Sequence, residues 1–138
     1  MKYACLVYIE EKKGEAPSEA DQTAIVAECD AAAVWQAELK QAGHFVFSAG
    51  LQSIRTAVTV RNRNGKVFMS DGPFAETKEF LGGFTIIEAR DMNEALQLVS
   101  KFQTRMLTIE VRPIMDPNAE LIDPLDRKIT EAIQRSHS

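Results

Sequence analysis

Runs of apolar residues and alternating polar positions along this chain predict strands and helices in turn. The stretch from Tyr3 to Ile9 is apolar at every position. Such a run predicts a strand that is covered on both faces, which is typical of a central strand. The stretch from His44 to Ala49 predicts another strand, with Phe45 and Phe47 on one face.

A long helix is predicted between these two strands, after a polar loop from Glu11 to Pro17. Ser18 is a natural N-cap, and Asp21 three residues later forms a weak variant of the capping box. Gly43 provides the C-terminal stop. One side of the helix is apolar except for Gln36, and we expect it to pack on a sheet with Trp35 in the core. This stripe comprises Ile25, Cys29, Ala32, Trp35, Gln36 and Leu39.

The middle of the chain predicts a β-hairpin. Thr56 to Asn62 and Lys66 to Ser70 flank Asn64-Gly65, the dipeptide that best tolerates positive φ at both central positions of a type I′ turn. Gly82-Gly83 then leads into a strand from Phe84 to Glu88, which we expect beside the first strand because both are apolar on two faces.

A second helix and a last core strand follow. Asp91 with Glu94 opens the helix, and its apolar stripe comprises Ala95, Leu98, Val99 and Phe102. Thr108 to Ile114 predicts a strand with one wet face, because Ile109 and Val111 alternate with charged residues. Pro113 favours a position at the sheet edge.

The order of these elements predicts an α+β fold: a ferredoxin-like βαββαβ core with an inserted hairpin over residues 1–114. Residues 115–138 are expected to form a linker, from Asp116 to Asp123, and a C-terminal helical tail. Asp123-Pro124 suits the N-cap and first position of that helix. Its apolar residues would close a cavity or clasp a partner subunit: Leu125, Ile129, Ala132 and Ile133.

Two helices can cover only one face of such a sheet. Leu6 and Tyr8, with either Thr85 and Ile87 or Phe84 and Ile86, would remain on the other face. A second copy is the simplest cover, so we expect a homodimer with the two sheets packed face to face.

Composition narrows the classes of function. The chain has 138 residues with a net charge of −4 and a pI near 5.2, so we expect no nucleic-acid binding, which requires clustered cations. The first apolar run ends at Glu10 and is too short for a signal peptide or a membrane span. We therefore expect a cytoplasmic protein.

Metal or redox chemistry finds little support in the sequence. Cys5 and Cys29 each lie among apolar neighbours and are interpreted as reduced core thiols. His44 follows a helix and His137 lies near the chain end, so we expect both to be solvated. No metal site and no cofactor are predicted.

The segment from Asp71 to Glu79 is the most informative candidate site. One interpretation is turn chemistry alone: Asp accepts backbone hydrogen bonds, Gly takes positive φ, and Phe74 folds back on the core. The other is a functional loop held by a rigid sheet, with Asp71 as acid/base or ligand anchor and Phe74 as a pocket wall. Glu76, Lys78 and Glu79 would add charge beside the pocket.

Two further groups are candidates. Tyr8 on the central strand would line the dimer cavity, with its hydroxyl seeking a polar partner. Arg61, Arg63 and Lys66 surround the hairpin tip, where they either hold an anion or, as is usual at exposed tips, keep it soluble.

The stretch Ser70-Asp71-Gly72-Pro73-Phe74-Ala75-Glu76-Thr77-Lys78-Glu79, followed by Leu81-Gly82-Gly83-Phe84, resembles the signature of YCII-related proteins of the DGPF type. Met1-Lys2-Tyr3, Ser48-Ala49-Gly50-Leu51-Gln52 and Ile109-Glu110-Val111-Arg112-Pro113 support this resemblance, which covers about residues 1–114.

The resemblance implies a ferredoxin-like dimeric α/β barrel, similar in fold to lactone isomerases. Members of the wider group can carry a His and Asp pair in a pocket, but residues 18–42 contain no histidine, so only Asp71 is carried over by motif. DGPF-type members also tend to be encoded near alternative sigma factors, which suggests a regulatory or accessory role.

Three hypotheses follow. The chain is an enzyme-like pocket protein that binds a small, partly apolar molecule through Asp71, Tyr8, Phe74, Glu76 and Lys78. Alternatively, it is a non-catalytic dimeric module linked to transcriptional control, or a structural domain without a pocket.

Overall fold

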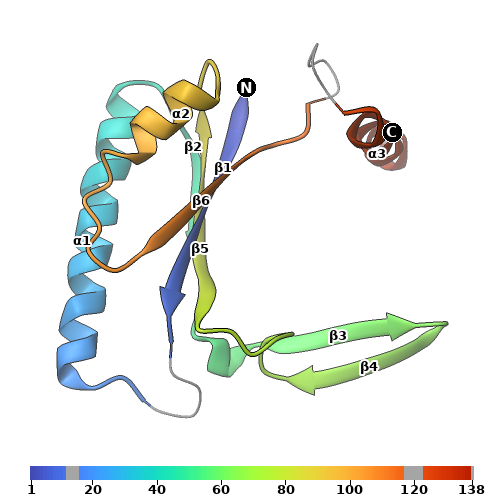
Figure 1. The fold of residues 1–138 in the computed structure, drawn as a ribbon, viewed down its shortest axis with the longest axis horizontal. Helices are drawn as coiled ribbons and strands as arrows, with labels where there is room; N and C mark the ends of the chain where they lie inside the picture. The colour runs from blue at the N-terminus through green and yellow to red at the C-terminus, as the bar shows by residue number, and fades with distance from the viewer. Residues whose placement is uncertain (12–15, 117–122, 138) are drawn as a thin grey trace.

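The computed structural model of the chain describes residues 1–11, 16–116 and 123–137. It has an α+β fold in which a four-stranded sheet is packed against two helices, while a hairpin and a third helix project from the opposite side (Figure 1). The predicted fold class is therefore confirmed at the level of α+β. The expected linker from Asp116 to Asp123 lies almost wholly outside the described residues.

The helices and strands occur in the predicted order. They are β1 (Lys2–Glu10), α1 (Glu19–Gln41), β2 (Phe45–Gly50), a 3₁₀ turn (Ile54–Thr56), β3 (Val58–Arg63), β4 (Lys66–Asp71), β5 (Glu79–Glu88), α2 (Met92–Val99), β6 (Thr108–Pro113) and α3 (Pro124–His137).

The main sheet has the strand order β2-β5-β1-β6, with every neighbouring pair antiparallel. β1 is central and lies beside β5, as the two-faced apolar pattern predicted. β6 is an edge strand, and its Pro113 pairs with Tyr3. β3 and β4 form a separate two-stranded sheet.

Local signals place the ends of α1 where the sequence predicted them. The Ser18 hydroxyl accepts a hydrogen bond from the Asp21 amide at 3.1 Å, and the Ser18 amide donates to the Asp21 carboxylate at 3.2 Å. This is a complete capping box. Gly43, at φ +79°, ends the helix and donates its N–H to the Lys40 carbonyl oxygen at 3.2 Å.

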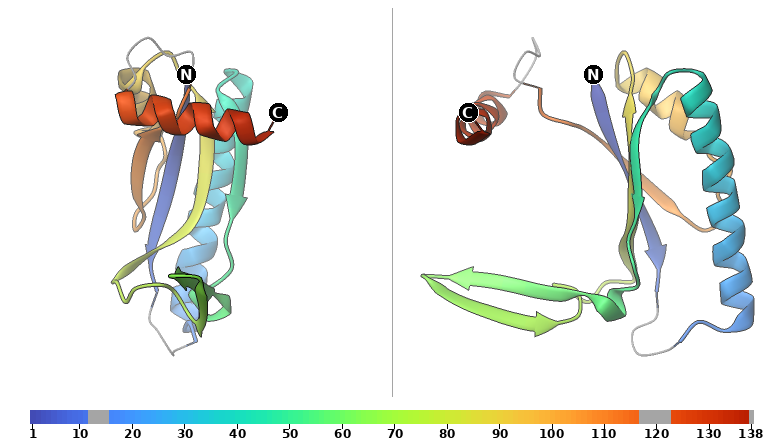
Figure 2. Two further views of the ribbon diagram at one scale, coloured as in Figure 1. Left: turned by 90° about the vertical axis from the view of Figure 1, so that its right-hand side faces the viewer. Right: turned by 180° about the vertical axis from the view of Figure 1, so that it is seen from behind.

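The core lies between the sheet and the two helices α1 and α2 (Figure 2). The indole N–H of Trp35 donates to the Leu98 carbonyl oxygen at 2.9 Å, and its ring lies 4.9 Å from that of Phe102. The prediction that Trp35 belongs to the core is therefore confirmed. The buried cluster comprises Tyr3, Cys5, Trp35, Leu39, Ile87, Ala89, Ala95 and Phe102.

The predicted stripe on α1 is wrong at one position. Cys29 is exposed, whereas Cys5 is buried as expected. Glu28 is buried instead, because its carboxylate accepts hydrogen bonds from the Thr104 hydroxyl at 2.6 Å and from the Arg105 amide at 2.9 Å. A carboxylate with two such donors can leave water without a large penalty.

The prediction that Phe45 and Phe47 share a face is also wrong. A register shift in β2 pairs Phe45 with Ile87 and Phe47 with Ile86. Because successive residues of β5 point to opposite faces, Phe45 faces the core and Phe47 faces the other side of the sheet.

The hairpin and the tail helix have the predicted caps and turns. Asn64 and Gly65 have φ values of +53° and +82°, as a type I′ turn requires. Asp123 accepts a hydrogen bond from the Leu125 amide at 2.8 Å at the start of α3. No helix in the described part of the chain is long and apolar enough to cross a membrane.

Candidate functional site

One face of the main sheet is covered by α1 and α2, and the opposite face has no helix packed along it (Figures 1 and 2). Thr85 and Ile87 are buried in the core, so Phe84 and Ile86 point to the uncovered face. Their partners Leu6 and Ala4 on β1 point the same way. The rings of Phe47 and Phe84 lie 6.0 Å apart there.

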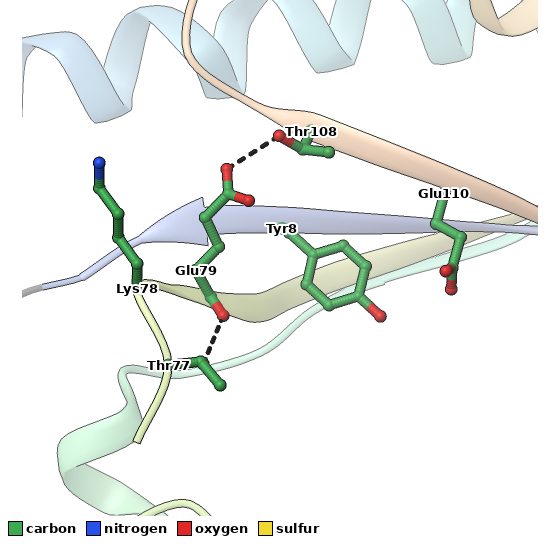
Figure 3. A pocket seen from close by; sticks show the side chains of 6 residues that line it. All are labelled: Tyr8, Thr77, Lys78, Glu79, Thr108 and Glu110. Carbon is green, nitrogen blue, oxygen red and sulfur yellow. Dashed lines mark hydrogen bonds between the residues drawn. The ribbon is translucent and has the colours of Figure 1, made fainter. Parts of the chain in front are cut away.

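An open pocket of about 430 Å³ lies at the end of this face where β1 finishes (Figure 3). It is formed where the ends of β1, β5 and β6 meet the segment that precedes β5. The pocket is lined by Tyr8, Thr77, Lys78, Glu79, Thr108 and Glu110. These side chains offer a phenol, two hydroxyls, an ammonium group and two carboxylates.

Hydrogen bonds hold one wall of the pocket. The Thr108 hydroxyl donates to the Glu79 carboxylate at 2.8 Å, and the Thr77 hydroxyl donates to the Glu79 carbonyl oxygen at 2.7 Å. Glu79 therefore joins β6 to the start of β5. In Figure 3 the Tyr8 hydroxyl and the Glu110 carboxylate have no hydrogen bond to the other lining side chains. Both groups therefore keep their hydrogen-bonding capacity toward the pocket.

The glycine pair within β5 shapes the sheet beside the pocket. The pairing of β1 with β5 skips Gly82, so that Val7 lies opposite Gly83 and Tyr8 lies opposite Leu81. A Cβ atom on Gly83 would lie 2.9 Å from the Ala49 carbonyl oxygen. Glycine therefore allows β2 to approach β5 closely while the bulge sets the position of Tyr8.

Asp71 lies outside this pocket. It is the last residue of β4, is exposed, and pairs with Val58 of β3. Gly72 follows at φ +93° and donates its N–H to the Ala57 carbonyl oxygen at 2.7 Å. The positive φ is the turn chemistry that the sequence suggested for this glycine.

The rest of the loop is tied to β3. The Thr59 hydroxyl donates to the Gly72 carbonyl oxygen at 2.8 Å, and the Arg61 guanidinium donates to the Phe74 carbonyl oxygen at 2.7 Å. The Phe74 side chain is 77 % exposed and so does not fold back on the core within one chain. Arg61 therefore holds the loop, a role that its exposed position on the hairpin did not predict.

The structure thus brings together only part of the predicted site. Tyr8 and Lys78 line the pocket, while Asp71, Phe74 and Glu76 are not among its lining residues. Lys78 Nζ also lies 3.9 Å from the Glu10 carboxylate, in an exposed ion pair.

Sequence reasoning placed Glu79 beside the pocket but did not single out Thr108 and Glu110. Thr108 and Glu110 alternate on the wet face of β6, and this alternation was the available signal. Their position beside Tyr8 depends on the pairing of β1 with β6, which brings Thr108 opposite Tyr8.

Two buried groups have altered acidities, and both lie in the core rather than in the pocket. Burial raises the pKa of the Cys5 thiol from 9.0 to about 11. Burial and, to a smaller extent, the nearby Asp91 carboxylate raise the pKa of Tyr3. Neither thiol nor phenol is placed for chemistry on a ligand in the pocket.

In the part of the chain that the structure describes, the histidines and acidic residues form no recognisable metal centre. His44, which we expected to be solvated, is half-buried, and its Nδ1 lies 2.8 Å from the Glu88 carbonyl oxygen. His137 is exposed, as expected. Within residues 1–11, 16–116 and 123–137, no three histidine, cysteine, aspartate or glutamate side chains are grouped as metal ligands.

Comparison with known proteins identifies the family. A sequence model described as the YCII-related domain matches residues 1–118. The chain is also 33% identical over 117 residues to an uncharacterised protein of Rhizobium meliloti (strain 1021), an alignment that covers 83% of this chain and 92% of that protein. The chain therefore belongs to the YCII-related family.

Proposed function

We propose that the chain is a homodimeric pocket protein that binds a small, partly apolar molecule at the Tyr8 end of the uncovered sheet face. The observation that carries this proposal is the pocket itself, where Tyr8 and Glu110 present unengaged polar groups beside an apolar surface. Converging polar groups in a concave site are what fix the orientation of a small molecule.

The fold that we propose is the ferredoxin-like dimeric α/β barrel of the DGPF type. The strand order β2-β5-β1-β6, with α1 and α2 on one face, is consistent with that arrangement. Packing two sheets face to face would cover Leu6, Phe47, Phe84 and Ile86, because a two-fold axis brings the same face of each copy together. The proposed setting is the cytoplasm, where the free thiols of Cys5 and Cys29 stay reduced.

The chemistry of the pocket indicates the kind of ligand. The apolar side chains of the sheet face suit a ring or a short hydrocarbon, and the Glu110 carboxylate accepts hydrogen bonds from ligand hydroxyl or amine groups. The Tyr8 hydroxyl can donate or accept. Lys78, at the mouth, attracts an anionic group.

Asp71 remains the proposed acid/base or anchoring carboxylate, with Phe74 as a wall and Glu76 beside it. Within one chain Asp71 is exposed, so this role needs a surface that the monomer does not supply. We assign the primary binding contacts to Tyr8 and Glu110, and the role of Asp71 to the assembled dimer.

The test is ligand-observed NMR with a library of small aromatic acids, phenols and amines. We expect hits whose binding weakens at least about tenfold in Tyr8→Ala and Glu110→Ala. Glu131→Ala, an exposed change on α3, is the control and should bind as the wild type does. Equal binding by all three variants would exclude the pocket as the site.

A separate variant tests Asp71. Asp71→Asn should reduce binding or turnover of the hits while the melting temperature stays nearly constant, because Asp71 is exposed and outside the core cluster. A large loss of stability instead would favour the turn-only interpretation.

The second candidate is a non-catalytic accessory module linked to transcriptional control. The observation that favours it is the exposed apolar stripe on α3, formed by Leu125, Ile129 and Ile133, which suits a protein partner. Specific capture of one protein that is lost in Ile129→Asp, together with no hits in the NMR library, would support this candidate over the first.

A further inference from the structure

The two faces of the β3–β4 hairpin differ sharply in chemistry. In an antiparallel pair, residues opposite each other share a face. Val60 lies opposite Met69, and Asn62 lies opposite Val67. Val58, two residues before Val60, points to the same side. We call this the valine face of the hairpin: Val58, Val60, Asn62, Val67, Met69 and Asp71.

The opposite face is cationic. Arg61 lies opposite Phe68, and Arg63 lies opposite Lys66. Apart from Phe68, this face has the composition of a solvated surface. The segregation means that the valine face, and not the whole hairpin, is the part that needs a partner.

Nothing in the described part of the chain covers the valine face. Its apolar side chains are 56–72 % exposed: Val58, Val60, Val67 and Met69. A two-stranded ribbon alone is only marginally stable in water and usually requires packing on another surface. Exposing such a face without a partner would also favour aggregation.

The hairpin projects from the main sheet on the side that α1 and α2 leave uncovered, and α3 lies on that same side at the other end of the sheet (Figures 1 and 2). The uncovered sheet face and the two elements that bear the other exposed apolar surfaces, the hairpin and α3, therefore lie on one side of the molecule. One partner could cover more than one of them.

The total surface indicates how large that partner contact is. The chain exposes 10139 Å², whereas a compact monomer of 15.4 kDa is expected to expose about 7,200 Å². The surplus of roughly 3,000 Å² is several times the approximately 800 Å² that each partner buries in a standard interface. Summed over two chains it is roughly 6,000 Å², which matches only the largest obligate dimer interfaces.

We propose that the hairpin is a dimerisation arm whose valine face packs on a second copy of this chain. This inference rests on the proposed homodimer and adds to it a second contact beyond the sheets. A second copy is the occupant because a two-fold axis provides each hairpin with an equivalent apolar surface on the partner. One association then covers the surplus exposed surface of both chains.

The arm has a consequence for Asp71. Asp71 lies at the base of the valine face, opposite Val58. Docking of that face places the partner over the Asp71 carboxylate and removes it from bulk water. The second copy thereby completes the enclosure that the candidate carboxylate lacks in a single chain.

The test compares two adjacent residues on opposite faces. Met69→Glu puts a charge on the valine face, and Phe68→Glu makes the same charge change on the cationic face. Both side chains are exposed in the single chain, so both variants should fold, which circular dichroism and thermal melting will check. Sedimentation equilibrium then measures the dimer dissociation constant.

We expect Met69→Glu to raise that constant at least about a hundredfold, because a charge would be buried without a partner. Phe68→Glu should change it less than about threefold. Loss of dimer in both variants, or in neither, would overturn the arm. Slower hydrogen exchange of hairpin amides at high than at low protein concentration should accompany the dimer in the wild type, and equal exchange would also count against the arm.

A third variant separates this inference from the proposed dimer. Phe84→Glu places a charge on the uncovered sheet face. If Phe84→Glu abolishes the dimer and Met69→Glu does not, the face-to-face dimer stands and the arm is excluded. A wild-type chain that remains monomeric at all concentrations would overturn both.

Discussion

Individual buried residues show how this core combines apolar packing with a few satisfied polar groups. Glu28 connects α1 to the segment before β6 through hydrogen bonds to Thr104 and Arg105. Leu107 joins the same network, since its amide donates to the Thr104 hydroxyl at 3.0 Å. A carboxylate on the buried side of α1 is thus a structural residue, although its charge suggested solvent.

Cys5 should make the stability of the protein sensitive to alkaline pH. Its folded-state pKa of about 11 lies above the ordinary value of 9.0. The folded state therefore retains a proton that the unfolded state releases, so the contribution is complete below pH 9.0 and is lost as the pH rises to about 11. We expect a loss of about 2 kcal/mol in the free energy of unfolding by pH 10.5 that is due to this thiol.

The measurement is urea unfolding at pH 8.5 and pH 10.5 of the wild type, Cys5→Ala and Cys29→Ser. Cys5→Ala will be less stable at both values because it leaves a cavity, but its pH dependence should be smaller. Cys29 is exposed, so its variant should follow the wild type. Parallel pH dependence in all three proteins would contradict the assignment to Cys5.

At the scale of the elements, the contact of β2 with β5 depends on one glycine. Gly83 pairs with Gly50, but the two positions differ in space. A Cβ atom on Gly83 would meet the backbone carbonyl of Ala49 at 2.9 Å, whereas one on Gly50 would meet nothing within 4 Å. Neither has a positive φ, so the difference is one of steric room.

We therefore expect Gly83→Ala to destabilise the fold by about 1–3 kcal/mol, because β2 must shift as a backbone unit. Gly50→Ala, the matched change on the facing strand, should alter stability by less than about 0.5 kcal/mol. Urea unfolding followed by circular dichroism measures both. Equal effects of the two variants would show that β2 can move freely and would remove this steric argument.

At the scale of the whole molecule, the chain consists of a packed body and two projecting parts. The buried cluster contains no residue of β3, β4 or α3, so neither the hairpin nor α3 contributes to it. The body has its own core, while the projecting parts would be covered only in the proposed dimer. The exposed surface of the chain is larger than that expected for a compact monomer of the same mass, which agrees with this division.

Deleting the residues after Met115 tests the role of α3. We expect the body to keep nearly the same melting temperature, because the described residues of the deleted part supply none of the core cluster. If α3 clasps the partner, the dimer dissociation constant should rise at least about tenfold by sedimentation. No change in either stability or assembly would leave the α3 stripe without a role in the dimer.

The sequence by itself determined the order of the elements and most of their ends. The Ser18 capping box, the Gly43 stop and the Asn64-Gly65 turn depend on bonds between residues a few positions apart, so local residue types predict them. The apolar run of β1 likewise predicted its central position. The motif around Asp71 carried the resemblance to the YCII-related family, which the comparisons confirm.

Only the tertiary structure decided which side chains meet. The burial of Glu28, the opposite faces of Phe45 and Phe47, and the pocket that joins Tyr8 to Glu110 follow from contacts between distant segments. The bulges in β2 and β5 changed the register by one residue, which moves a side chain to the other face of a strand. Local periodicity does not reveal such a shift, so the sequence could not predict the pocket beside Tyr8. The candidate site that it did indicate was the Asp71 loop.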